Sequence, residues 1–181
     1  DHPKTAAGLT LLARALVYQK RNDEAKALLG EALAIRQRVY GPMHPTVAST
    51  TNELGNIAVA EDRHDEAVAY FSQMVEIYRA AYGGKHYLIG VALSNLASAF
   101  NGARQYAKAE PLFREAIAMY DATLPADHTT TAIAHIKLGR TLLRQRRFSE
   151  AAPETLAGYE VILATAAPGN SFLRAARIDL A

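Results

Sequence analysis

Four histidines recur along this chain at one constant interval, and this regular spacing constrains the fold more than any other feature. They are His2, His44, His86 and His128, and one further step of the same length reaches Asn170. A domain built around a single core has no reason to keep such a period, whereas a stack of equal structural units requires it. The spacing therefore predicts four stacked units and the start of a fifth.

The same period runs through apolar and small residues. Leucine recurs at Leu12, Leu54, Leu96, Leu138 and Leu180, and the residue after it is always small: Ala13, Gly55, Ala97, Gly139 and Ala181. Alanine recurs later in each unit, at Ala25, Ala67, Ala109 and Ala151. We expect the leucine and alanine columns to be buried between helices.

Within each unit the apolar residues follow helical spacing in two stretches separated by a short polar turn, which predicts an antiparallel helix pair. First helices are expected near residues 3–19, 45–61, 87–103 and 129–145, second helices near 23–39, 65–81, 107–123 and 149–165, and a last helix from about 171. The units then span residues 2–43, 44–85, 86–127 and 128–169, with a partial fifth at 170–181, in a single repeat array over 1–181.

Composition excludes several classes of protein. The chain has no cysteine, which rules out disulfide and thiolate chemistry and fits a cytoplasmic protein. No run approaches the roughly 18 to 20 apolar residues that span a bilayer, so we expect no membrane partner. A net charge of +2 is too small to indicate a nucleic-acid partner by itself. Because the sequence opens on Asp1 without an initiator methionine, we expect a fragment or a processed product.

These columns resemble the tetratricopeptide repeat, in which a large apolar or aromatic residue also occupies the second helix. That residue is Leu29, Phe71 and Phe113 here, and the fourth unit departs from the pattern at Thr155. The common form of the repeat is shorter, at about 34 residues. The 42-residue period and residues 39–48 (VYGPMHPTVA) resemble the longer variety of kinesin light chains and many bacterial repeat proteins.

The resemblance implies an all-α, right-handed superhelical array of antiparallel helix pairs. It also implies first helices that line a concave groove. The function that it implies is a non-enzymatic scaffold for protein or peptide ligands.

The histidine column has two interpretations, metal binding and helix capping. Successive units place equivalent residues too far apart for one ion, whose ligands lie about 2.0 Å away, and each histidine precedes a helix. We therefore expect caps and no metal site. The acidic run at 61–66 falls in a turn, and His135 falls on an apolar helix face, so both are expected to be structural. No phosphate-loop, metalloprotease or nucleophile motif occurs, and we predict no enzymatic activity and no cofactor.

The predicted groove is the candidate binding site. Its residues are Arg14, Asn52, Asn56, Asn95, Ser98, Asn101, Lys137, Arg140 and Arg144, with Glu53 among them; Thr10, Ser94 and Ile136 are expected on the same exposed face. Asparagine can bracket a peptide bond because it both donates and accepts, and Asn95 matches the family's peptide-binding asparagine before the signature leucine. The arginines can hold carboxylates bidentately.

Two other functions stay open. An array of this kind can be structural, with weak self-association through its ends or packing against a neighbouring domain. The basic residues Lys137, Arg140, Arg144, Arg146, Arg147, Arg174 and Arg177 instead suggest nucleic-acid binding. That second alternative lacks interleaved aromatic residues for base stacking, which makes nucleic acid the less favoured partner.

Overall fold

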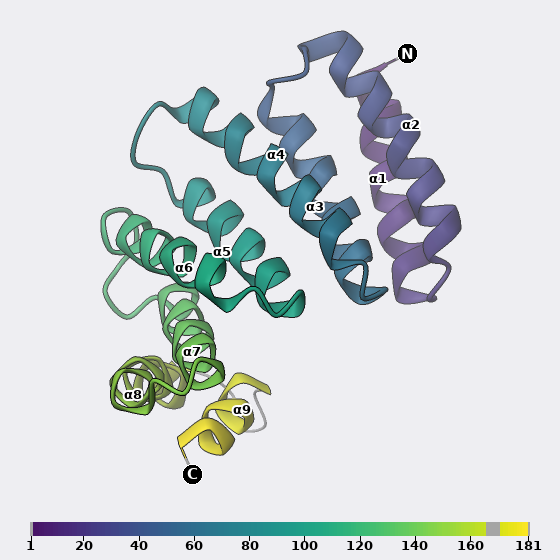
Figure 1. Ribbon diagram of the computed structural model, residues 1–181. Helices are drawn as coiled ribbons and strands as arrows, with labels where there is room; N and C mark the ends of the chain where they lie inside the picture. The colour runs from purple at the N-terminus through teal and green to yellow at the C-terminus, as the bar shows by residue number, and fades with distance from the viewer. Residues whose placement is uncertain (1, 166–170, 181) are drawn as a thin grey trace. The chain divides into compact units, whose positions relative to one another are not determined.

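The computed structural model describes residues 2–165 and 171–180, and the described residues form helices joined by turns (Figure 1). The first helices of the repeats are α1 (Pro3–Tyr18), α3 (Pro45–Ala60), α5 (Tyr87–Gly102), α7 (Thr129–Arg144) and α9 (Ser171–Leu180); the second helices are α2 (Asn22–Tyr40), α4 (His64–Tyr82), α6 (Tyr106–Asp121) and α8 (Phe148–Thr165). Each start and end lies within two residues of the position that the periodicity predicts. The fold is an all-α helical repeat array. Asn170 and Ala181, the last residues of two predicted columns, lie outside the described residues.

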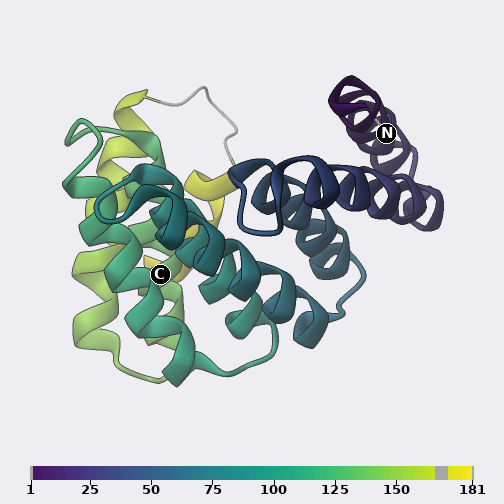
Figure 2. The same ribbon diagram turned by 90° about the horizontal axis from the view of Figure 1, so that it is seen from above.

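The chain divides into two compact units, residues 1–84 with α1–α4 and residues 85–181 with α5–α9. The boundary coincides with the turn between the second and third repeats. Within each unit every helix packs against the next, and first helices also contact each other, as α1 with α3, α5 with α7 and α7 with α9. Figure 2 shows the helix hairpins from above. No helix in the described part of the chain combines the length and the hydropathy that crossing a bilayer requires.

The histidine column caps α1, α3, α5 and α7, which confirms the structural interpretation. In each case the histidine Nδ1 accepts a hydrogen bond from the backbone N–H two residues later. The distances from backbone N to Nδ1 are 3.1 Å at His2, 3.2 Å at His44, 3.2 Å at His86 and 3.1 Å at His128. A side-chain acceptor at this position satisfies one of the amide groups that a helix start leaves without a partner.

The turn inside each repeat holds one residue in the left-handed conformation. Lys20, Asp62, Arg104 and Arg146 recur with the same period as the histidines and have φ values of 61°, 57°, 58° and 62°. Side chains other than glycine, asparagine and aspartate rarely adopt this conformation. At Lys20, Arg104 and Arg146 the conformation therefore follows from the packing of the two flanking helices and not from the preference of the residue.

The small residue after each signature leucine lets the two helices of a repeat approach closely. A Cβ atom built on Gly55 would lie 2.5 Å from Phe71 Cε1, and one on Gly139 would lie 2.1 Å from Thr155 Oγ1. Phe71 and Thr155 occupy equivalent positions in the second helices, since each follows its glycine at the same interval in the sequence. Thr155 replaces the large apolar residue of the other repeats, and its Oγ1 is buried without a hydrogen-bond partner among the described residues. The substitution in the fourth repeat therefore leaves a buried hydroxyl unsatisfied.

Burial confirms most of the signature columns and corrects two positions. Leu54, Leu96 and Leu138 are buried, but the side chains of Leu12 and Leu180 are exposed by 53% and 39%. Leu54 belongs to the same core cluster as Ala13 and Leu29 of the preceding repeat. Among the described residues no second helix covers the outer side of α1, and none follows α9, so Leu12 and Leu180 lack the neighbours that bury the others.

Two glycine-to-alanine changes test the close approach within a repeat. Gly55→Ala should lower the free energy of unfolding by about 1–3 kcal/mol, because the new methyl group has to displace the buried Phe71 ring. Gly8→Ala is the matched control, since Gly8 also lies inside a first helix but has nothing within 4 Å of the added Cβ. It should raise stability by about 0.5–1 kcal/mol through helix propensity. Urea unfolding measures both, and equal effects of the two changes would contradict this packing.

Candidate binding site on the first helices

The predicted site residues all lie on first helices, on a surface that we name the first-helix face. In the first unit it comprises Arg14 on α1 and Asn52, Glu53 and Asn56 on α3; in the second unit it comprises Asn95, Ser98 and Asn101 on α5, Lys137, Arg140 and Arg144 on α7, and Asp179 on α9. Neighbouring first helices contact each other within each unit. Stacking of the repeats therefore brings first-helix residues of successive repeats into contact.

Several of these residues bond to one another across adjacent first helices. In the first unit Arg14 Nε and Nη2 donate to Glu53 Oε1 over 3.0 and 2.6 Å. In the second unit Arg140 Nε and Nη2 donate to Asp179 Oδ2 over 3.0 and 2.8 Å. The two partners are 39 residues apart in both pairs. Arg140 and Asp179 are the equivalents of Arg14 and Glu53, three repeat periods further along the chain. Arginine thus joins one first helix to the next at corresponding places in the two units.

Lys137 makes a related link with different chemistry. Its Nζ donates to Ser98 Oγ over 3.2 Å, again across 39 residues. Burial lowers the pKa of the Lys137 ammonium, and the positive charge of Arg140 lowers it further. The ammonium is therefore held in the protein at an electrostatic cost, with a neutral hydroxyl in place of a carboxylate as its partner.

The predicted exposed face is wrong at three positions. Thr10, Ser94 and Ile136 are buried, with exposed fractions of 6%, 6% and 1%. The Thr10 hydroxyl donates to Ala6 O over 2.8 Å, and Ile136 packs with Ile162 and Leu173. A first helix in the stack touches its own second helix and the neighbouring repeats, so it buries a wider stripe than an isolated amphipathic helix would.

The asparagines of the predicted groove are not equivalent. Asn56 is exposed, whereas Asn52 and Asn95 are half-buried and each interacts with a group of the protein. Asn101 is also half-buried: its Nδ2 donates to Thr141 Oγ1 over 2.8 Å, and its Oδ1 is buried with no hydrogen-bond partner among the described residues. Asn101 therefore keeps one unused acceptor.

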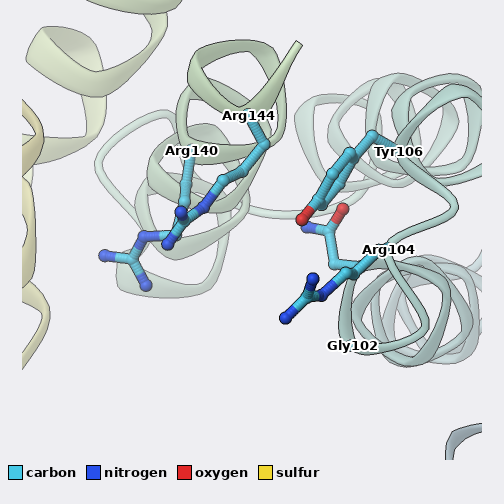
Figure 3. Close-up of a pocket in the computed structure, with 6 residues that line it drawn as sticks. Gly102, Arg104, Tyr106, Arg140 and Arg144 are labelled. Atoms are coloured by element: carbon cyan, nitrogen blue, oxygen red, sulfur yellow. The ribbon is translucent and has the colours of Figure 1, made fainter.

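A pocket of about 460 Å³ opens beside Asn101 in the second unit (Figure 3). Its lining residues are Asn101 and Gly102 at the end of α5, Arg104 in the following turn, Tyr106 at the start of α6, and Arg140 and Arg144 on α7. The lining has three arginines and no acidic residue. In Figure 3, Arg140 and Arg144 of α7 lie on one side and Arg104 and Tyr106 on the other. This arrangement can bind an anionic group.

Two of the lining residues were not predicted from the sequence. Arg104 and Tyr106 belong to the turn and to a second helix, whereas the prediction considered only first-helix positions. The sequence feature that could have identified Arg104 is the periodic column of turn residues to which it belongs. It indicates that each repeat projects a side chain from the same turn.

The two polar clusters set aside as structural are held by internal pairs. In the turn at 61–66, Arg63 pairs with Glu61 and with Glu66. His135 Nδ1 lies 2.7 Å from Glu154 Oε2, across the α7–α8 pair. The first cluster therefore holds the turn together, and the second joins α7 to α8.

Comparison with protein-family models places the chain among repeat proteins. Two family models described as tetratricopeptide repeat match the chain, one over residues 4–73 and 46–122 and the other over residues 94–171. A search of curated protein sequences gave no match.

Solved structures share the fold at low sequence identity. Nearly identical TPR-like repeats assigned to a kinesin light chain of Podosopora anserina superpose with a TM-score of 0.80 at 23% identity, over 99% of this chain and 85% of that one. BtubC (BKLC) from P. vanneervenii gives 0.82 at 18% identity, over 93% and 68%. Aspartyl phosphate phosphatase F from Bacillus subtilis gives 0.82 at 15% identity, over 99% and 45%. These similarities establish the fold alone.

The buried ammonium of Lys137 predicts a pH-dependent stability difference. In Lys137→Met the charge is gone, so the variant should be at least as stable as the parent near pH 7. As pH rises toward the ordinary lysine pKa of 10.5, the folded parent loses its proton before the unfolded chain does. Its free energy of unfolding then rises relative to that of the variant. Urea unfolding of both proteins at several pH values measures the difference, and a gap that stays constant or moves the other way would contradict the assignment.

Proposed function

Since the chain belongs to the tetratricopeptide repeat family, we propose that it is a non-enzymatic scaffold that binds a segment of another protein along its first-helix face. The repeat is a protein–protein interaction module, and the proposal concerns which surface binds. The leucine and alanine columns form the core, so stacking does not need the outward side of the first helices. A stacked array leaves such a surface available for ligands.

The observation that carries this proposal is the group of polar residues that remains on the first-helix face after internal bonding. Asn56 and Arg144 are exposed, and the Arg144 side chain has no ion pair or hydrogen bond within the described part of the chain. An exposed amide can pair with both groups of a ligand's peptide bond. A guanidinium group can hold a ligand carboxylate in a bidentate manner.

Internal pairing divides the face by charge. In the first unit Glu53 neutralises Arg14, which suits neutral backbone groups of a ligand. In the second unit Arg144 adds a positive charge without an acidic neighbour. The face of the first unit therefore suits a ligand segment that presents backbone amides, and the face of the second unit suits one that presents an acidic group.

The same pairing weighs against nucleic acid as the partner. Of the basic cluster in the last third of the sequence, Lys137 donates to Ser98, Arg140 pairs with Asp179 and Arg147 pairs with Glu150. Cations engaged inside the protein release fewer counterions on binding a phosphate backbone, and that release supplies most non-specific affinity. The cluster is less available than its composition suggests.

Self-association is a second candidate, favoured by an apolar surface on α1. Leu11, Leu12 and Tyr18 are exposed by 65%, 53% and 91%, and exposed apolar side chains gathered on one helix can mark an interface. If this function holds, sedimentation velocity should detect dimers that Leu12→Glu abolishes. A monomer at all concentrations would exclude it.

A peptide-display selection on the whole chain tests the proposed function. Selected peptides should bind with micromolar affinity, about −8 kcal/mol, and Asn56→Ala or Arg144→Ala should weaken each of them by roughly fivefold to tenfold. Glu76→Ala is the matched control, because Glu76 is exposed on the second helix α4. Peptides that bind both first-helix variants as tightly as the parent would show that this face is not the site.

A further inference from the structure

The pocket beside Asn101 has an excess of positive charge that nothing around it balances. Arg140 is held by Asp179, but neither the Arg104 nor the Arg144 guanidinium has an ion pair or hydrogen bond among the described residues. Elsewhere Arg21, Arg114 and Arg147 each pair with a glutamate. Two uncompensated guanidinium groups that line one cavity repel each other, and an anion between them removes that repulsion.

The number of free charges points to the kind of anion. A phosphate monoester carries about 1.5 to 2 negative charges at neutral pH and three acceptor oxygens, whereas a carboxylate carries one charge and two oxygens. Each guanidinium can donate two parallel hydrogen bonds to such a group. The Tyr106 hydroxyl, which also lines the pocket, adds a neutral donor. The donors and charges match a phosphoryl group better than a single carboxylate.

Asn101 indicates what the phosphoryl group is attached to. Asn101 lines the same pocket, and its Oδ1 is a buried acceptor without a partner among the described residues. Leaving such an oxygen without a partner costs roughly 1–3 kcal/mol, and neither a phosphate dianion nor a carboxylate has a hydrogen to donate. A peptide backbone N–H next to a phosphorylated side chain does. The volume of about 460 Å³ also exceeds what one phosphate group fills.

We propose that this pocket is a subsite for a phosphorylated serine or threonine of a partner protein, with Arg104 and Arg144 on the phosphoryl oxygens and Asn101 Oδ1 on the adjoining backbone N–H. That the ligand is a peptide rests on the proposed function above. Arg140, already bonded to Asp179, forms the outer wall. Binding at this place makes the scaffold responsive to phosphorylation of its partner.

Arg104 offers a variant that separates binding from folding. Its φ of 58° is strained for arginine, and asparagine adopts this conformation more readily. Arg104→Asn should therefore fold at least as stably as the parent while losing the guanidinium. Arg146→Gln is the control for net charge, because Arg146 occupies the same place in the next turn but does not line the pocket.

The test uses a capped pentapeptide, acetyl-Ala-Ala-phosphoserine-Ala-Ala-amide, with serine and aspartate versions, titrated into the ¹⁵N-labelled chain. We expect the phosphopeptide to bind at least roughly tenfold more tightly than either version, with shifts at the Nε–H signals of Arg104 and Arg144. Arg104→Asn and Arg144→Gln should each weaken it by roughly tenfold, and Arg146→Gln by less than about twofold.

Each other result overturns the inference in a different way. Equal binding of the serine version, or an equal loss in Arg146→Gln, removes the phosphate subsite. Equal binding of the aspartate version assigns the pocket to carboxylates. If inorganic phosphate binds as tightly as the phosphopeptide, Asn101 has no role in binding the peptide backbone. If only a single-stranded oligothymidylate binds, and Arg104→Asn weakens it, the pocket belongs to nucleic acid. The display-selected peptides separate the scaffold proposal from the phosphate-subsite proposal. They are unphosphorylated, so they can still bind the first-helix face if phosphorylation of the pentapeptide has no effect.

Discussion

The close contact between the two helices of each repeat is the constraint on which the rest of the structure depends. A glycine or alanine after the signature leucine lets the large residue of the second helix, such as Phe71 against Gly55, lie directly on the first helix. This contact fixes the spacing and angle of the pair. The turn between the two helices then holds one residue in the left-handed conformation in each of the four complete repeats, as at Arg104. The histidine caps set where α1, α3, α5 and α7 begin.

Once the pairs have equal geometry, first helices meet at a regular offset, and side chains 39 or 40 residues apart become neighbours. Arg14 with Glu53 and Arg140 with Asp179 use this offset as ion pairs, and Lys137 with Ser98 uses it as a hydrogen bond. Ion pairs with a solvent-exposed arginine contribute little stability each, typically below about 1 kcal/mol. Their larger effect is to neutralise part of the first-helix face, which leaves Arg144 and the turn residue Arg104 as positive charges without partners within the described residues.

Much of this fold could be predicted from the sequence, because the period repeats every helix signal several times. Helix limits, the buried leucines of the inner repeats and the histidine caps follow from local patterns. The binding surface was harder to predict. Burial of Thr10, Ser94 and Ile136 depends on neighbours from adjacent repeats, and the partners of Arg140 and Lys137 depend on the offset between helices. Arg104 and Tyr106 escaped prediction because they reach the pocket from a turn and a second helix.

The central claim is that the first-helix face, and not the second helices, binds the partner. Hydrogen–deuterium exchange of the whole chain, with and without a saturating display-selected peptide, tests it most directly. Bound ligand restricts local opening of the backbone that it covers. The account predicts slower exchange in first helices such as α3 and α7, with the second helices α2, α4 and α6 unchanged. Protection confined to the second helices would contradict it.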